Sequence, residues 1–141
     1  MSTILKVNNL KKYYGKNSSN ITKAVNGINF NIEKQEFVAI MGASGSGKTT
    51  LLNCISTIDE VTSGNIYIDS KDITNIKENE LADFRRQELG FIFQDFNLLD
   101  TLTIEENIAL SLIINQEKED IIDQKVIDIA KKLGIDNILK K

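Results

Sequence analysis

A glycine-rich segment at residues 42–49 places the strongest constraint on what this chain can fold into. The segment reads Gly42-Ala43-Ser44-Gly45-Ser46-Gly47-Lys48-Thr49, and a continuous apolar run at residues 37–41 precedes it. Such a run is typical of a strand buried on both faces, as in a parallel sheet. A helix is expected from about Lys48, because apolar residues recur there on one side: Leu51, Leu52, Ile55 and Ile58. The sequence therefore predicts a buried strand, a tight loop and a helix, which is the arrangement of an α/β fold.

The spacing Gly-x-x-x-x-Gly-Lys-Thr in this segment is that of a P-loop, or Walker A motif. Glycines let successive backbone N–H groups point at phosphate oxygens, and the start of the following helix adds its positive dipole end. We expect Lys48 to contact the β- and γ-phosphates, Thr49 to bind Mg²⁺ and Thr50 to hydrogen-bond an inner phosphate. The residues predicted to bind the triphosphate are Gly42, Ala43, Ser44, Gly45, Ser46, Gly47, Lys48, Thr49 and Thr50. The alternative is a glycine-rich turn that binds no ligand.

Period-two patterns predict several strands outside this segment. Alternating apolar and polar residues indicate strands in a small antiparallel sheet with one solvated face. We expect a polar loop at residues 15–20 and a polar helix at about residues 80–87. Alternation marks a strand at Ile28, Phe30 and Ile32 and another at Ile66 and Ile68; residues 5–14 and 89–94 are strand-like as well.

The last part of the chain is expected to be helical from Thr103 onward. One amphipathic stripe is formed by residues spaced three or four apart: Ile122, Val126, Ile129 and Leu133. Gly134 follows directly and is a suitable end for this helix. No strand is predicted after Gln94.

Composition argues for one globular domain and against nucleic acid as the main partner. The 141 residues include 17 basic and 20 acidic ones, giving a net charge of −3, and no basic block stands out. The single cysteine, Cys54, lies among apolar residues, so we expect it to be buried. No segment reaches the roughly 20 apolar residues of a membrane helix, and the N-terminus has no signal-peptide pattern. We expect a cytoplasmic protein that reaches a membrane only through a partner.

Taken in order, several segments resemble the ATP-binding domain of ABC transporters. They are Lys12-Tyr13-Tyr14-Gly15 and residues 24–30, 37–52, 63–68, 85–99 and 102–108. The last two segments are similar to the exporter subgroup that serves lipoprotein release, macrolide export and bacitracin-type antimicrobial-peptide transport. The resemblance implies an incomplete α/β P-loop NTPase of the ABC type, with an antiparallel β part, a parallel sheet with helices and the start of a helical subdomain. We expect residues 1–36 to form the antiparallel part, 37–100 the P-loop to Q-loop core and 101–141 the helical segment.

By position, the resemblance implies two more site residues. Tyr14 matches the aromatic residue that stacks on the adenine in the family, with Tyr13 as an adjacent alternative, and favours ATP as the nucleotide. Gln94 matches the Q-loop glutamine, which in the family contacts Mg²⁺ or the attacking water and lies where the membrane subunit docks. Lys48 and Gln94 are thus the two residues of this chain that are expected to take part in catalysis. Without the family, residues 91–95 could be a degenerate Walker B strand with Asp95 as the Mg²⁺ ligand.

Other motifs of the family are not found in this sequence. There is no Leu-Ser-Gly-Gly-Gln signature, no apolar strand ending in paired acids after Gln94, and no histidine that could act as the switch residue. The resemblance implies the ATP-binding subunit of an exporter, peripheral on the inner face of the cell membrane, with a transmembrane permease as partner. It also implies a second ATPase subunit in a head-to-tail dimer, or a complementing C-terminal half, and little or no hydrolysis by this chain alone.

Two functions other than an exporter subunit are compatible with a P-loop. A stand-alone, non-hydrolysing nucleotide-binding or regulatory module is the main alternative, whereas a small kinase or GTPase is disfavoured because neither an Arg-rich lid nor Asn-Lys-x-Asp is found.

In the family, the strands beside residues 37–41 come from the rest of the domain. Without them we expect this run to expose unpaired edges, and residues 104–139 to present an apolar stripe.

Overall fold

The computed structural model of the protein describes residues 2–15 and 20–141. The chain folds into two compact units, one that ends at Phe91 and one that spans Ile92–Lys141. The first unit contains the strands and the first two helices, and the second contains the remaining helices. The polar loop predicted for residues 15–20 falls mostly on residues 16–19, which lie outside the described residues.

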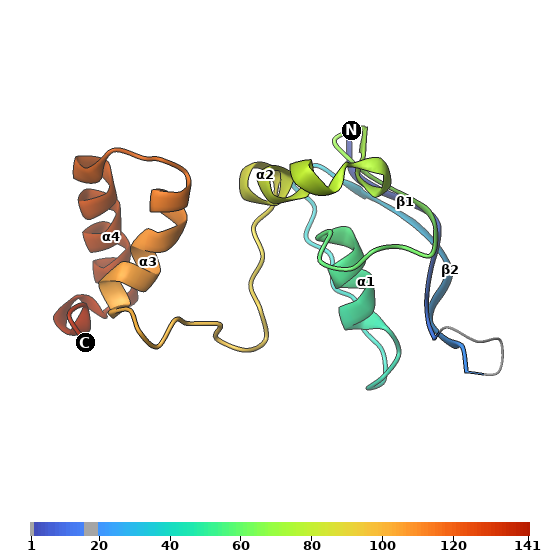
Figure 1. The fold of residues 1–141 in the computed structure, drawn as a ribbon, viewed down its shortest axis with the longest axis horizontal. Helices are drawn as coiled ribbons and strands as arrows, with labels where there is room; N and C mark the ends of the chain where they lie inside the picture. Colours follow the sequence, from blue (N-terminus) through green and yellow to red (C-terminus); the bar gives the residue numbers. More distant parts are fainter. Residues whose placement is uncertain (1, 16–19) are drawn as a thin grey trace. The chain divides into compact units, whose positions relative to one another are not determined.

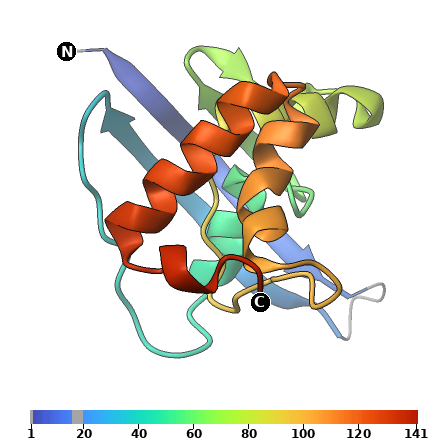
Figure 2. The ribbon, with the colours of Figure 1, turned by 90° about the vertical axis from the view of Figure 1, so that its left-hand side faces the viewer.

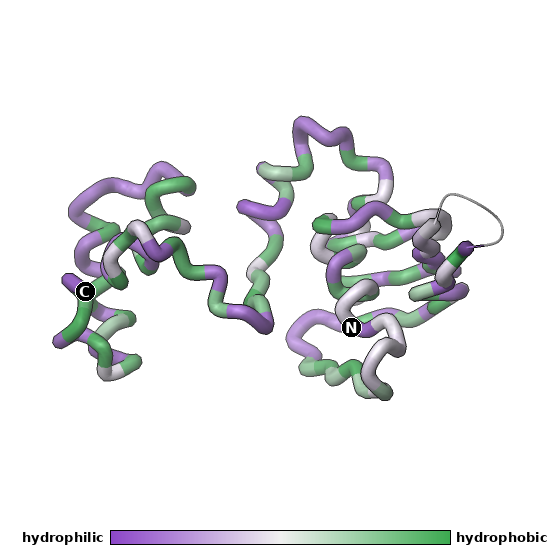
Figure 3. Tube along the Cα trace, turned by 60° about the horizontal axis from the view of Figure 1, so that its bottom comes forward, coloured by the Kyte–Doolittle hydropathy of each residue, from purple (hydrophilic) through white to green (hydrophobic). Residues whose placement is uncertain are grey.

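An antiparallel sheet of four strands forms the framework of the first unit (Figure 1). β1 (Thr3–Tyr14) lies between β2 (Thr22–Glu33) and β3 (Ser63–Ile68), and β4 (Lys71–Asp72) follows β3 in the sheet. Hydrophobic and hydrophilic residues alternate along the strands (Figure 3), as expected for a sheet with one solvated face. These strands, and their antiparallel pairing, confirm the predictions made from alternation.

The buried face of the sheet packs against helix α1 (Lys48–Ile55). Val7 and Leu10 of β1 are both buried although they lie three positions apart, because a bulge at Asn9, with φ of 44°, inserts an extra residue into β1. Of the residues predicted on the buried side of α1, Leu51 is buried, whereas Leu52 is exposed. The buried members of this core are Val7, Leu10, Val25, Leu51, Cys54, Ile66, Ile73 and Phe84.

Two short elements complete the first unit. The 3-10 helix η1 (Ile73–Asn75) is capped by the Asp72 side chain, which accepts a hydrogen bond from the N–H of Thr74 at 3.0 Å. Helix α2 (Glu78–Glu88) confirms the polar helix predicted at about residues 80–87 and buries Phe84. Acidic residues in its first turn and arginines in its last turn complement the helix dipole.

The apolar segments at residues 37–41 and 89–94 do not form the predicted strands. Neither segment is paired with a strand among the described residues, and most of their side chains are exposed; Phe37 is 97% exposed and Ile92 is 98% exposed. The predicted strand was wrong for both segments, and so was the predicted burial of residues 37–41, because an apolar run forms a buried strand only when neighbouring strands pair with its edges and helices cover its faces. Residues 37–41 have no strand partner among the described residues, as expected in the absence of the neighbouring strands.

Helices α3 (Ile104–Ile114) and α4 (Glu119–Leu133) form the second unit and lie side by side (Figures 1 and 2). The 3-10 helix η2 (Asp136–Ile138) follows them. Thr103 and Glu106 form a capping box at the start of α3, in which each side chain bonds the backbone N–H of the other residue. None of the helices in the described part of the chain is both long and apolar enough to cross a membrane.

Helix α4 ends as predicted, but its buried line differs from the predicted stripe. Gly134 adopts the left-handed conformation, with φ of 68°, directly after the last turn. Val126 and Ala130 are buried, whereas Ile129 and Leu133 are exposed. The two buried residues are therefore four positions apart, and Ile129 and Leu133 of the predicted stripe remain accessible.

Candidate nucleotide-binding site

The predicted P-loop joins residues 37–41 to α1 within the first unit. Gly47 caps α1 in the left-handed region, with φ of 89° and ψ of 10°. A Cβ at this position would lie 2.2 Å from the backbone oxygen of Ala24 in β2, so no larger residue fits without movement. The N–H of Ser46 donates to the carbonyl oxygen of Ala43 at 3.2 Å, which closes a tight turn. The loop thus has the compact, glycine-dependent geometry in which backbone N–H groups can surround an anion.

The ammonium of Lys48 lies against this loop. Its Nζ donates to the carbonyl oxygens of Gly42, at 2.9 Å, and Ala43, at 2.8 Å, and lies 3.5 Å from the Oγ of Ser46. Lys48 is half-buried and begins α1, so its charge adds to the positive end of the helix dipole. The structure therefore brings Lys48 and the P-loop backbone, both predicted to contact the phosphates, together in one small site.

The chemistry of the donors around the start of α1 fits a polyphosphate. The first N–H groups of a helix have no partner within the helix, and the first turn of α1 contains no acidic residue that would repel an anion. Thr49 is exposed in this turn, where its hydroxyl can serve as an oxygen ligand of a hydrated Mg²⁺. Within the described residues, no group of three or more His, Cys, Asp or Glu side chains is arranged to hold a metal ion.

Tyr14 lies at the end of β1 and is connected through Asp59 to the loop that follows α1. The Tyr14 hydroxyl donates to the Asp59 carboxylate at 2.5 Å, and the N–H of Asp59 donates to the carbonyl oxygen of Asn53 in α1 at 3.1 Å. The bond to Asp59, followed by burial, raises the pKa of Tyr14. Tyr13 is instead occupied elsewhere: its hydroxyl donates to the Asn26 side chain at 2.5 Å. The structure thus joins Tyr14, rather than Tyr13, to the loop that follows the helix carrying the P-loop lysine.

Comparison with known proteins decides the family. The family model described as "ABC transporter" matches residues 25–141, which include the P-loop, α1 and everything that follows. The chain belongs to the ABC transporter family. The resemblance of its ordered sequence segments to the ATP-binding domain of that family is therefore confirmed.

The curated relatives of the chain include two bacterial ATP-binding proteins of ABC transporters. It is 51% identical, over its whole length, to ABC transporter ATP-binding protein YxdL of Bacillus subtilis, of which it covers 54%. It is 50% identical to the bacitracin export ATP-binding protein BceA of Halalkalibacterium halodurans, with 98% of this chain and 54% of BceA covered. The chain spans about half the length of these relatives.

Solved ABC structures confirm the fold class, a partial P-loop NTPase of the ABC type. The ATP-binding cassette MJ0796 of Methanocaldococcus jannaschii, solved as a post-hydrolysis dimer bound to ADP and Pi, superimposes with a TM-score of 0.87 at 35% identity. The match covers 96% of this chain and 60% of that one. A second dimeric structure of MJ0796 gives a TM-score of 0.82 at 38% identity, with 90% of this chain and 56% of the other covered.

Gln94 and Asp95 belong to the second unit of this ABC chain, whereas the P-loop and Tyr14 belong to the first. Both residues are exposed and neither lies in a strand. The structure therefore gathers the predicted phosphate and base contacts in one unit and leaves the predicted Q-loop glutamine in the other. The role of Gln94 stays a prediction.

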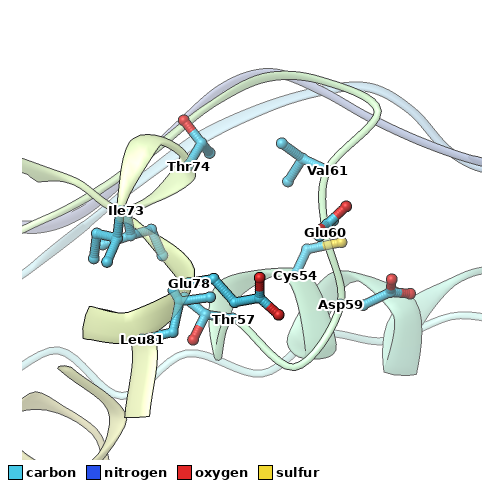
Figure 4. A pocket seen from close by; sticks show the side chains of 10 residues that line it. Cys54, Thr57, Asp59, Glu60, Val61, Ile73, Thr74, Glu78 and Leu81 are labelled. Atoms are coloured by element: carbon cyan, nitrogen blue, oxygen red, sulfur yellow. The ribbon is translucent and has the colours of Figure 1, made fainter. Parts of the chain in front are cut away.

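Sequence reasoning about the site missed Lys12 and Asp59, which surround Tyr14. Asp59 lies 45 positions from Tyr14 and joins it by a hydrogen bond between side chains, a pairing that no local pattern encodes. Asp59 also borders a cavity of about 210 Å³ in the first unit, which it shares with Cys54 and Thr57 (Figure 4). Cys54 is buried, as predicted, and burial raises the pKa of its thiol to about 11.

Proposed function

We propose that the chain is the ATP-binding subunit, or the N-terminal part of such a subunit, of an ABC-type exporter. The observation that carries the proposal is the P-loop geometry, in which Lys48 lies against a compact glycine loop at the start of a helix without acidic residues. In this setting an ammonium and several N–H groups offer charge-assisted hydrogen bonds to a triphosphate.

The predicted residues take distinct roles in this proposal. The P-loop N–H groups and Lys48 bind the phosphates, Thr49 supplies a hydroxyl to Mg²⁺, and Tyr14 stacks on the adenine. Gln94 would supply an amide oxygen to Mg²⁺ or to the attacking water once its segment approaches the phosphates.

Hydrolysis by this chain alone is expected to be slow or undetectable. Phosphoryl transfer depends on groups that position the water and stabilise the developing charge. The 141-residue sequence contains no signature motif, no Walker B strand with its acidic pair, and no histidine. We therefore propose nucleotide binding as the function of this chain, with turnover requiring a complementing C-terminal half or a second ATPase subunit in a head-to-tail dimer.

Membrane partnership is the remaining part of the proposal. Relatives of the chain include a bacitracin export protein and, at 41% identity, the macrolide export protein MacB of Mannheimia succiniciproducens. By this relationship we infer a transmembrane permease as partner, a position on the inner face of the cell membrane, and export of a peptide or drug. Within the first unit, the exposed apolar side chains of Phe37 and Met41 favour a further polypeptide over solvent as their neighbour.

Isothermal titration calorimetry with Mg-ATP tests the proposal. Replacing Lys48 by Ala removes a charged donor, which is expected to weaken binding by about tenfold to a hundredfold. Lys131→Ala, which removes the same charge from the last turn of α4, is the matched control and should bind ATP as the unchanged chain does. Equal affinity of the Lys48→Ala chain and the unchanged chain would rule out the proposed site.

A phosphate-release assay tests the second part. The chain alone should release phosphate at no more than background rate, and adding a separately produced C-terminal half from a full-length relative should restore turnover. Sustained turnover by the chain alone, abolished by Lys48→Ala, would show that the groups needed for hydrolysis are already present here.

A further inference from the structure

The side chains of Lys12, Tyr14 and Asp59 contact one another, and Tyr14 is the residue predicted to contact the base. One oxygen of the Asp59 carboxylate lies 2.5 Å from the Nζ of Lys12, and the other accepts the hydroxyl of Tyr14 at 2.5 Å. The ammonium of Lys12 also lies over the ring of Tyr14, 4.8 Å from its centre, in the geometry of a cation–π contact. Asp59 therefore fixes Tyr14 twice, directly through the hydroxyl and indirectly through the lysine on the ring.

The loop that carries Asp59 is itself held in place. Its backbone N–H donates to the carbonyl oxygen of Asn53 in α1 at 3.1 Å, and the Nζ of Lys12 donates to the carbonyl oxygen of Glu60 at 2.7 Å. From α2, Arg85 donates to the carbonyl oxygen of Thr57 at 3.1 Å. Because β1, α1 and α2 all bind this loop, Asp59 is a firm support for the residues that it contacts.

Lys12 lies over one side of the Tyr14 ring, and 41% of the residue is exposed. A flat aromatic ligand would therefore have to stack on the side of the ring away from Lys12. Since Asp59 accepts the Tyr14 hydroxyl and its own N–H donates to Asn53 of α1, the ring is also held relative to α1.

We infer that Asp59 is a positioning residue for base recognition, which holds the Tyr14 ring so that a purine base stacks on the side away from Lys12 while the P-loop holds the phosphates. The inference rests on the proposed nucleotide-binding function and adds to it a residue that does not touch the nucleotide. Its consequence is selective: loss of Asp59 weakens ligands that have a base and leaves ligands made only of phosphate unchanged.

The experiment compares Mg-ATP with Mg-tripolyphosphate by calorimetry on the full chain. For Asp59→Ala, we expect affinity for ATP to fall by between about twofold and tenfold, the range of a weakened aromatic stack, with tripolyphosphate affinity unchanged. Asp69→Ala is the matched control, because Asp69 pairs with Lys34 at an exposed site, and it should alter neither affinity. Lys48→Ala, measured in the same titrations, should weaken both ligands.

A second variant guards against loss of folding. Asp59→Ala leaves the ammonium of Lys12 without its carboxylate partner, so its fold is checked by circular dichroism. Tyr14→Phe keeps the aromatic face and removes only the hydroxyl that Asp59 holds; it should show the same selective loss. Adding Asp59→Ala to Tyr14→Phe should have less than the additive effect, because both changes break one interaction.

The outcomes separate this inference from the function on which it rests. Equal loss for ATP and tripolyphosphate in both Asp59→Ala and Tyr14→Phe, or no loss for either ligand, would overturn the positioning role. So would equal affinity of the unchanged chain for the two ligands, since there would then be no base contact to position. Failure of Lys48→Ala to weaken tripolyphosphate would instead overturn the proposed phosphate site.

Discussion

Gly47 at the start of α1 lies so close to Ala24 of β2 that a Cβ on Gly47 would be 2.2 Å from the Ala24 backbone oxygen. This contact holds the P-loop helix against the sheet at the point where the N–H groups predicted to bind phosphate begin. The glycine is therefore required twice, by its left-handed backbone conformation and by the close approach of β2. The same contact makes the loop a structural support of the first unit as well as a site.

Replacing Gly47 by Ala should destabilise the first unit and impair the P-loop together. We expect a loss of more than about 2 kcal/mol, because the strain of a positive φ adds to a backbone clash. Gly45→Ala is the informative control: Gly45 has φ of 78° but nothing within 4 Å of its Cβ position, so only about 1 kcal/mol of backbone strain is expected. Urea unfolding followed by tyrosine fluorescence measures both, since all three tyrosines lie in the first unit. Similar losses for the two variants would refute the role of the Ala24 contact.

A second prediction concerns Phe37, which the sequence places in a buried strand and the structure leaves 97% exposed. Phe37→Ser should change the stability of this chain by less than about 0.5 kcal/mol, as is usual for exposed positions. Leu10→Ala, at a fully buried position of β1, should cost about 2 to 5 kcal/mol in the same urea titration. A large loss for Phe37→Ser would mean that residues 37–41 are buried in solution.

The contrast between Leu10 and Phe37 explains which parts of the fold the sequence could predict. The strands β1, β2 and β3 pair with one another, so the segments whose alternation predicts them also supply their partners. Residues 37–41 are equally apolar, but burial of such a run depends on partner strands that its own pattern does not encode. Helix positions followed from periodicity, although in α4 the structure buries Ala130 and exposes Ile129 of the predicted stripe, a choice that depends on tertiary packing and not on the pattern.

The residues of the candidate site also differ in whether the sequence could predict them. The P-loop residues and Lys48 are contiguous in the chain, so their spacing alone carries the prediction of a phosphate site. Tyr14 was predicted only through its position in a resembling family. Asp59 had no signal at all, because its link to Tyr14 depends on how the loop after α1 folds back onto the end of β1.

A third prediction follows from the buried thiol of Cys54, the pKa of which burial raises to about 11 from an ordinary value of 9.0. Only the thiolate reacts with iodoacetamide, so at about pH 8 the folded chain should be alkylated at least about a hundred times more slowly than the chain in urea. Because the folded pKa is raised, the associated stability is present below pH 9.0 and is lost as the pH rises toward about 11. Equally rapid alkylation of folded and unfolded chains would contradict the burial of Cys54.

The last prediction concerns acid and the ion pair between Lys12 and Asp59. Burial alone would raise the pKa of Asp59, but the hydrogen bonds from Lys12 and Tyr14 outweigh it and lower the pKa below the ordinary 3.8. A lowered folded pKa gives stability that is present above 3.8 and is lost as the pH falls through the folded value. The difference in thermal midpoint between the unchanged chain and Asp59→Ala should therefore be largest near neutral pH and should shrink as the pH falls below 3.8. Asp69→Ala, which breaks only an exposed ion pair, should lower the midpoint little at neutral pH. If the Asp59→Ala difference stays constant from neutral pH to acid, the ionised carboxylate contributes nothing to holding Lys12 and Tyr14, and only the packing of its side chain stabilises the loop.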